Sequence, residues 1–136
     1  MNITLEADYA VRIIDFLAKK NTRTGASEIA RMTGVTTRFT LKILHKLTAC
    51  KIVVSYKGAK GGYELAKPAG EITLREVIET VEGPYTFSRC LNPDHSCNCG
   101  SEACQSGGCR FQRVYDDISK VVREKLGSVT FDRDVT

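Results

Sequence analysis

Residues 26–47 read ASEIARMTGVTTRFTLKILHKL, and this stretch decides the fold. Apolar residues at helical spacing in its first half predict a short helix, which Gly34 ends. Thr36 has the side chain of an N-cap, so a second helix is expected directly after it. The inner side of that helix is predicted to carry Phe39, Ile43, Leu44 and Leu47, and the outer side Thr37, Arg38, Lys42, His45 and Lys46. Two short helices around a glycine turn, the second with a basic outer face, are typical of a helix-turn-helix.

The following residues, 52–66, read IVVSYKGAKGGYELA and predict a β-hairpin. Residues 52–56 alternate as a strand requires, and residues 63–66 form a second β-like run. The segment between them holds three glycines, which permit positive φ and close backbone approach. Lys57 and Lys60 lie at its tip. A hairpin with a basic tip, placed directly after a helix-turn-helix, indicates a wing.

Three further helices are expected from apolar spacing and caps. The apolar face of the first helix is predicted at Ala7, Ala10, Val11, Ile14, Leu17 and Ala18. Thr73 and Glu76 form a capping box at the start of another helix, which ends near Gly83. The last helix, from about Phe111 to Leu126, has an apolar surface that is large for the end of a small domain. This surface suggests packing on a partner subunit.

Charge is distributed unevenly along the chain. Residues 1–70 hold 12 Lys and Arg against 5 Asp and Glu, whereas residues 71–136 hold 8 against 11. The basic half is therefore expected to meet a polyanion, with the second helix of the motif in a DNA major groove and the wing at a minor groove. The candidate DNA contacts are Thr36, Thr37, Arg38, Lys42, Lys46, Lys57 and Lys60. The alternative is a protein-interaction module in which these are ordinary solvated side chains.

Five of the six cysteines cluster in one polar stretch, at Cys90, Cys97, Cys99, Cys104 and Cys109. This stretch cannot bury enough apolar surface to offset its ordering entropy without a ligand. Thiolates suit iron–sulfur clusters and zinc. The spacing lacks the paired knuckles of most structural zinc sites, which favours a 2Fe–2S or 4Fe–4S cluster over zinc, and zinc over a bare thiol switch. The sixth cysteine, Cys50, is expected to be a small buried hydrophobe.

Other function classes find little support in the sequence. No apolar run approaches the roughly 18 residues that span a bilayer. Glu6 and Asp8 precede the first apolar stretch, which is wrong for a secretory signal, so a cytoplasmic protein is expected. We find no Ser/His/Asp arrangement, no phosphate-binding glycine loop on a βαβ unit and no acidic pair in an obvious cleft, so neither an enzyme nor a small-molecule substrate is predicted.

Four segments resemble the Rrf2 family of winged-helix transcription regulators, typified by IscR and NsrR. They are ADYAVR at 7–12, SEIARMTGVTTRFTLKILHKL at 27–47, GAKGGYELAKP at 58–68 and EITLREVIETVEG at 71–83. The cysteine loop and last helix follow in the family's order, so the resemblance covers nearly the whole chain. It implies a homodimer with crossed C-terminal helices and a cluster near the dimer interface.

The resemblance also implies a ligand set. Three loop cysteines bind the cluster in relatives. Cys109 matches the last of them and Cys104 the middle one, while the first is Cys90, Cys97 or Cys99.

The fourth ligand differs between branches of the family. In the nitric-oxide-sensing branch it is an aspartate in the first helix of the other subunit, a position that Asp8 occupies here. The histidines that two other branches use are replaced by Gln112 and Arg12. Ligation by cysteines alone is the alternative, with Asp8 serving only as a favourable charge near the start of its helix.

The sequence therefore predicts an α+β fold, a winged helix-turn-helix with a cysteine-rich loop and a long C-terminal dimerisation helix. The expected parts are a DNA-binding domain at 1–83, a cluster-binding loop at 84–110, and a dimerisation helix with its tail at 111–136. The hypothesis is a homodimer that represses, or less often activates, promoters through a pseudo-palindromic operator. The cluster would sense redox state, nitric oxide or iron and cluster status. A zinc-stabilised interaction module and a cluster-free thiol switch are the alternatives.

Overall fold

The computed structural model describes residues 3–92 and 109–132. Its elements, in chain order, are α1 (Leu5–Lys20), α2 (Ala26–Thr33), α3 (Thr37–Ala49), β1 (Val53–Tyr56), β2 (Gly62–Leu65), η1 (Ala69–Glu71), α4 (Leu74–Glu82), η2 (Arg89–Leu91) and α6 (Arg110–Gly127). The chain divides into two compact units. The winged-helix unit holds the residues up to Gly83 and those from Leu126 onward, and the helix unit holds the residues from Pro84 to Lys125. The α+β winged-helix fold predicted from the sequence is confirmed.

Local signals set the helix ends of the winged-helix unit. Thr4 caps α1 by accepting a hydrogen bond from Ala7 N at 3.1 Å. The chain leaves α2 through Gly34, whose φ of 72° suits a residue without a Cβ. Thr36 then caps α3 by accepting from Phe39 N at 3.3 Å, as the sequence predicts. The turn between α2 and α3 is thus fixed by one glycine and one hydroxyl.

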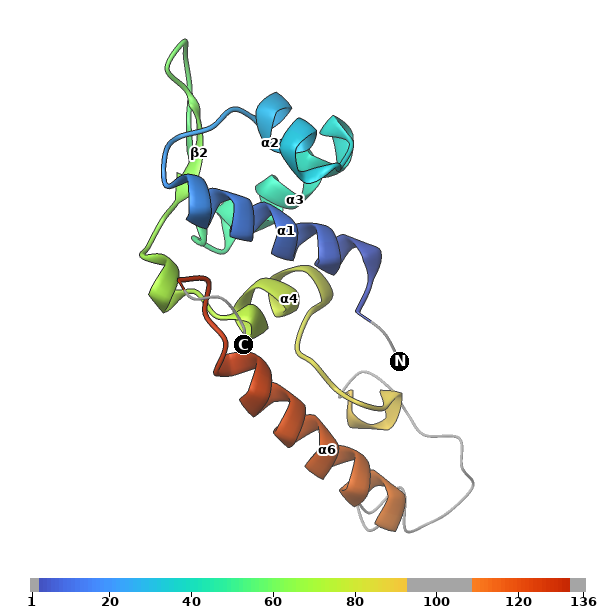
Figure 1. The fold of residues 1–136 in the computed structure, drawn as a ribbon. Coiled ribbons are helices and arrows are strands. Elements are labelled where there is room, and N and C mark those ends of the chain that lie inside the picture. The colour runs from blue at the N-terminus through green and yellow to red at the C-terminus, as the bar shows by residue number, and fades with distance from the viewer. Residues whose placement is uncertain (1–2, 93–108, 133–136) are drawn as a thin grey trace. The chain divides into compact units, whose positions relative to one another are not determined.

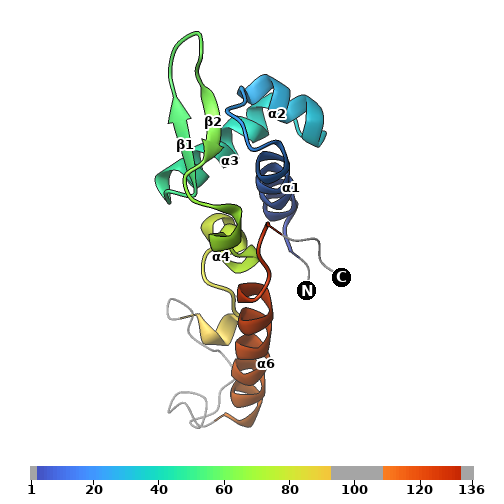
Figure 2. The same ribbon diagram turned by 60° about the vertical axis from the view of Figure 1, so that its left-hand side comes forward.

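The hairpin is an antiparallel pair with Val53 opposite Leu65 and Tyr56 opposite Gly62, and Figure 2 shows it extending beyond the helices of its unit. Thr24 pairs with its second strand: Thr24 N donates to Tyr63 O at 2.9 Å and Tyr63 N donates to Thr24 O at 2.8 Å. Gly62 has a φ of 140°, and a Cβ there would lie 2.7 Å from Thr24 O. Only glycine allows this close backbone approach.

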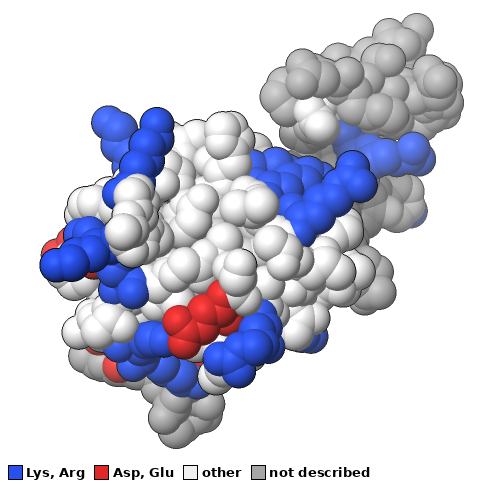
Figure 3. Space-filling model, turned by 90° about the horizontal axis from the view of Figure 1, so that it is seen from above, with Lys and Arg blue, Asp and Glu red and all other residues white. Residues whose placement is uncertain are grey.

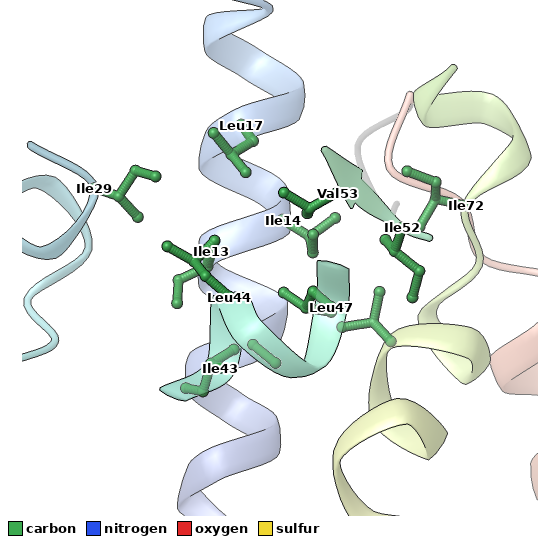
Figure 4. Close-up of a cluster of buried hydrophobic side chains, with 12 residues drawn as sticks. Ile13, Ile14, Leu17, Ile29, Ile43, Leu44, Leu47, Ile52, Val53 and Ile72 are labelled. Atoms are coloured by element: carbon green, nitrogen blue, oxygen red, sulfur yellow. The ribbon is translucent and has the colours of Figure 1, made fainter. Parts of the chain in front are cut away.

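The core of the winged-helix unit surrounds α1 (Figure 4). Its fully buried members are Ala10, Ile13, Ile14, Leu17, Ile29, Ile43, Leu44, Leu47, Ile52, Val53, Ile72 and Val77. The inner side of α3 differs from the prediction: Phe39 is 41% exposed, and Thr40 is fully buried in its place. Thr40 shares a helix side with Ile43, Leu44 and Leu47, which follow it by three, four and seven residues. Cys50 is exposed where a buried thiol was predicted, because it lies past the end of α3.

The chain after α6 returns to the winged-helix unit. Leu74 N donates to Val129 O at 2.9 Å, and Phe131 packs against the core cluster. At the start of α4, Thr73 accepts from Glu76 N at 3.1 Å, which is half of the predicted capping box. The Glu76 carboxylate instead accepts from Lys67 Nζ at 2.7 Å.

The helix unit is built on α6 (Figure 1). Among the residues of this unit that the structure describes, Ser119 is the buried one. Its hydroxyl accepts from Phe87 N and donates to Tyr115 O, both at 2.8 Å. The centroids of the Phe87 and Tyr115 rings lie 5.5 Å apart. The outward apolar side chains of α6 are Phe111, Val114 and Val121, each at least half exposed. Among the described residues, no helix combines the length and apolar character that a membrane span needs.

Candidate nucleic-acid interface and thiol segment

The outer side of α3 presents the first group of predicted DNA contacts. Thr37, Arg38 and Lys42 are all exposed. The Thr36 hydroxyl is engaged as the helix cap, which leaves its second lone pair and the neighbouring backbone for any ligand. Arg38 and Lys42 line a shallow hollow of about 530 Å³ together with Phe39. The geometry thus brings one guanidinium, one ammonium and one aromatic ring to the start of the helix.

Glu6 of α1 engages two lysines of α3. Its carboxylate accepts from Lys46 Nζ at 2.8 Å and lies 3.6 Å from Lys42 Nζ. The Lys46 hydrogen bond, opposed by partial burial and helped by the charges of both lysines, holds the pKa of Glu6 below its usual value. Lys46 is therefore directed at α1 and half-buried, whereas the Lys42 side chain stays 55% exposed. The sequence predicted Lys42 as a contact to a base edge and Lys46 as a contact to phosphate, but it could not reveal this carboxylate 40 residues away from Lys46.

The second group lies on the hairpin. Lys57 and Lys60 are exposed at its tip, where Gly58 takes a φ of 95° and Gly61 N donates to Gly58 O at 2.9 Å. A Cβ on Gly61 would lie 2.5 Å from the carbonyl oxygen of Tyr56. The glycines in the tip therefore permit the tight turn that exposes both lysines.

Arg23 braces the hairpin, a role that the sequence did not reveal. Its guanidinium carbon lies 3.4 Å from the centre of the Tyr56 ring, and its Nη1 donates to Lys60 O at 3.3 Å. Its Nη2 lies 3.8 Å from the Glu64 carboxylate. Arg23 thus touches the end of the first strand, the tip and the second strand of the hairpin at once. An arginine in a polar turn carries no sequence signal of such a role.

Figure 3 shows the face of the molecule on which α2, α3 and the hairpin lie. Lys and Arg side chains are spread around a mostly uncharged surface there, with few Asp or Glu side chains among them. This distribution agrees with the basic balance of residues 1–70. A surface of this kind attracts a polyanion.

The thiol segment, residues 90–109 with the five clustered cysteines, is described only at its two ends. Cys97, Cys99 and Cys104 lie outside the described residues. Cys90 and Cys109 are free, half-buried thiols. Cys90 is fixed by two contacts, since its Sγ donates to Ser88 Oγ at 3.3 Å and its carbonyl accepts from Gln112 Nε2 at 3.1 Å. Cys109 directly precedes α6, and its carbonyl accepts from Arg113 N at 3.2 Å.

Asp8 lies near the start of α1, with its side chain 38% exposed and 2.8 Å from Arg12 Nη2. Gln112, at the position where one family branch has a histidine, uses its amide on the Cys90 backbone. Residues 3–92 and 109–132 contain no convergent group of three His, Cys, Asp or Glu side chains. The two thiols that are described suit the chemistry of iron–sulfur ligation, because thiolates are the usual ligands of such clusters.

The family model called Rrf2, described as "Iron-dependent Transcriptional regulator", matches residues 3–135. The chain belongs to the Rrf2 family. This Rrf2 chain is 36% identical over 92 residues to protein aau3 of Rhizobium meliloti, a match that covers 67% of the chain and 60% of that relative. It is 32% identical over 117 residues to the HTH-type transcriptional regulator NsrR of Oceanobacillus iheyensis, covering 84% of the chain and 76% of the relative.

Among solved structures, this Rrf2 chain superposes on CymR, the global cysteine regulator of B. subtilis, with a TM-score of 0.75 and 25% identity. The alignment covers 97% of the chain and 94% of CymR. The family description and the name of the NsrR relative are those of transcriptional regulators and not of enzymes. The resemblance predicted from the sequence is confirmed.

Proposed function

We propose that this Rrf2 protein is a homodimeric DNA-binding regulator, most simply a repressor, whose affinity for a pseudo-palindromic operator is set by an iron–sulfur cluster. The observation that carries the DNA-binding part is the arrangement of α2, α3 and the hairpin, with Arg38, Lys42, Lys57 and Lys60 exposed on it. In this arrangement the second helix enters the major groove, and its N-terminal side chains reach base edges. The hairpin lysines then meet phosphates or the minor groove.

The side chains have separable roles in this proposal. Arg38 forms bidentate hydrogen bonds to guanine, a contact that discriminates by ~1–3 kcal/mol. Thr37 and the free part of Thr36 contact the backbone or a base edge. Lys42 reaches a base edge, and the hairpin lysines meet phosphates or the minor groove. Lys46 can bind phosphate only after its ammonium group leaves the Glu6 carboxylate, to which it donates a hydrogen bond of 2.8 Å.

The cluster part rests on the thiol segment. Cys104 and Cys109 would hold the cluster with one of Cys90, Cys97 and Cys99, and the remaining ligand would be Asp8 of the partner subunit or another cysteine. The family description names iron dependence, and the free thiols of Cys90 and Cys109 supply suitable donors. A bound cluster would be the group that responds to the signal, either by gaining or losing electrons or by being destroyed. The chain's own part would be to supply the thiolates that hold it.

The homodimer rests on the exposed apolar side of α6. Phe111, Val114 and Val121 are each at least 52% exposed. A pseudo-palindromic operator requires a two-fold symmetric protein, because half-sites lie about one helical turn apart. Sedimentation of the protein measures this state, and a monomer at micromolar concentration would contradict the proposal.

DNA binding is tested with duplexes selected from a random-sequence pool. We expect the dissociation constant to rise steeply with salt, by roughly 0.9 log units per log unit of salt for each phosphate contacted. Lys60→Ala should lower that slope by about one for each phosphate contact that it removes from the complex. Lys51→Ala, another exposed lysine of the same unit, is the control. Failure to enrich any duplex would instead favour a protein-interaction module.

The cluster is tested by anaerobic purification with iron, sulfide and zinc analysis. We expect iron and sulfide in the wild-type protein, and loss of both from the Cys104→Ser and Cys109→Ser variants. Cys50→Ser is the matched control, since Cys50 is exposed and outside the thiol segment. A colourless protein loaded with zinc would favour the structural-zinc alternative. A metal-free protein whose DNA affinity responds to thiol oxidants would favour the thiol switch.

A further inference from the structure

One apolar side chain lies among the polar groups on the outer side of α3. Leu41 is 45% exposed. It follows Thr37 by four residues and Arg38 by three, and it precedes His45 by four. Residues at these spacings share a side of a helix. Leu41 therefore belongs to the same surface as the proposed DNA contacts.

The other exposed apolar residue of this helix is accounted for differently. Phe39 packs its ring edge-to-face on Tyr9 of α1, with the ring centroids 6.0 Å apart. It lies three residues before Lys42, whose Nζ is 5.9 Å from the Phe39 ring. Phe39 thus faces α1, whereas Leu41 occupies the side that turns away from the buried Thr40, Ile43 and Leu44.

An apolar side chain in a major groove is selective by exclusion. Base edges of guanine, adenine and cytosine present hydrogen-bonding atoms there, and covering those atoms with a leucine leaves them without partners. Thymine alone presents a methyl group, which an apolar side chain can cover favourably. The positive charge of Arg38 and Lys42 beside Leu41 matches DNA better than it matches an apolar protein surface.

We propose that Leu41 is a specificity-determining residue that packs on the 5-methyl group of a thymine in each half-site. The proposal rests on the DNA-binding function above and adds one base to its recognition code. The thymine lies within reach of the base pair that Arg38 contacts, because the two side chains are one helical turn apart.

The test replaces each thymine of a selected duplex with deoxyuridine, which removes only the methyl group. We expect a single substitution in one half-site to weaken wild-type binding about threefold to fivefold, the effect of exposing one buried methyl group. Leu41→Ala should weaken binding to the thymine duplex and lose all further sensitivity to deoxyuridine. Met32→Ala, which truncates another exposed apolar side chain (54%) of the same motif, should keep that sensitivity.

The outcomes separate the two proposals. If no duplex is enriched, DNA binding itself fails. If duplexes bind but deoxyuridine is tolerated at every position, or if Leu41→Ala remains as sensitive as the wild type, DNA binding stands and the role of Leu41 is wrong. If Leu41→Ala changes the oligomeric mass and not the base preference, Leu41 belongs to a protein interface and the proposal is also wrong. Leu41 is exposed, so the alanine variant is expected to fold, and its Tm checks this.

Discussion

The guanidinium of Arg23 lies 3.4 Å from the centre of the Tyr56 ring, which places a residue of the α1–α2 connection over the first strand of the hairpin. The same side chain donates to Lys60 O at the hairpin tip. A two-stranded hairpin alone is marginally stable, so its direction depends on such braces. Arg23 thereby couples the position of the tip lysines to the helix-turn-helix.

Replacing Arg23 with alanine should therefore weaken DNA binding without unfolding the protein. Contacts between exposed cations and rings are worth about 0.5–1 kcal/mol, so we expect a modest loss in Tm and a roughly fivefold loss in DNA affinity. Lysine at this position keeps the charge but not the planar stacking surface, so Arg23→Lys should rescue binding only in part. Titration of the selected duplex by fluorescence anisotropy measures these effects.

A double-mutant cycle shows whether Arg23 acts through the hairpin tip. Lys60→Ala should cost affinity in the wild type and much less in the Arg23→Ala background, because the tip is then no longer held against the DNA. Additive losses from the two substitutions would mean that Arg23 contacts DNA by itself, and the bracing role would be wrong.

Ser119 links the segment that leads into the cysteines to α6. Its hydroxyl makes two hydrogen bonds of 2.8 Å, to Phe87 N and Tyr115 O. Ser119→Ala leaves the Phe87 N–H without that acceptor, which should cost about 1–3 kcal/mol locally. Faster amide exchange at residues 85–92 would report it. Ser55→Ala, on the exposed edge of β1, is the control and should leave exchange there unchanged. Unchanged protection in Ser119→Ala would contradict the linking role.

The ion pair between Lys20 and Glu28 predicts a pH-dependent effect. Lys20 Nζ lies 2.6 Å from the Glu28 carboxylate, and this hydrogen bond, opposed by slight desolvation and aided by the charges of Lys20 and Arg31, lowers the pKa of Glu28 below its ordinary value. A carboxyl whose pKa is lower in the folded state stabilises the fold above the unfolded-state pKa, and this stabilisation is lost as pH falls through the folded-state pKa. Glu28→Gln should thus be slightly less stable than wild type at pH 7.

Urea unfolding at two pH values checks this sign. The difference between wild type and Glu28→Gln should disappear once the pH is below the folded-state pKa of Glu28, and it should shrink at pH 7 in high salt because the pair is exposed. A difference that persists unchanged at low pH would show that the substitution acts through packing and not through charge.

Local signals were enough to predict most of the winged-helix unit. Thr36 and Thr73 cap their helices as expected, because a hydroxyl three residues before an amide acts within one turn. The hairpin limits were also predicted to within about one residue, since glycines determine where the chain can turn. Contacts between distant segments were not predictable. Neither the stacking of the Arg23 guanidinium on the Tyr56 ring nor the ion pair of Glu6 with Lys46 produces a periodic pattern in the sequence.

The errors on α3 and beyond have a common cause. Phe39 and Cys50 were expected inside because of their residue types, yet both are exposed. The helical phase decides which residue faces the core, and it places Thr40, a polar residue, where the larger Phe39 was expected. The candidate ligands Cys97, Cys99 and Cys104 lie outside the described residues, so their roles remain predictions.

Thr40 leads to the last prediction. It is fully buried, and within the described residues its hydroxyl has no hydrogen-bond partner. Valine has nearly the same shape without the hydroxyl, so Thr40→Val should raise the free energy of unfolding by about 1–3 kcal/mol, the cost of an unpaired buried hydroxyl. Urea unfolding measures the change. Thr48→Val is the matched control on the same helix, because the Thr48 hydroxyl does donate to Leu44 O, at 2.7 Å, and no comparable gain is expected. A loss of stability in Thr40→Val would mean that the Thr40 hydroxyl binds a partner in solution, such as a buried water.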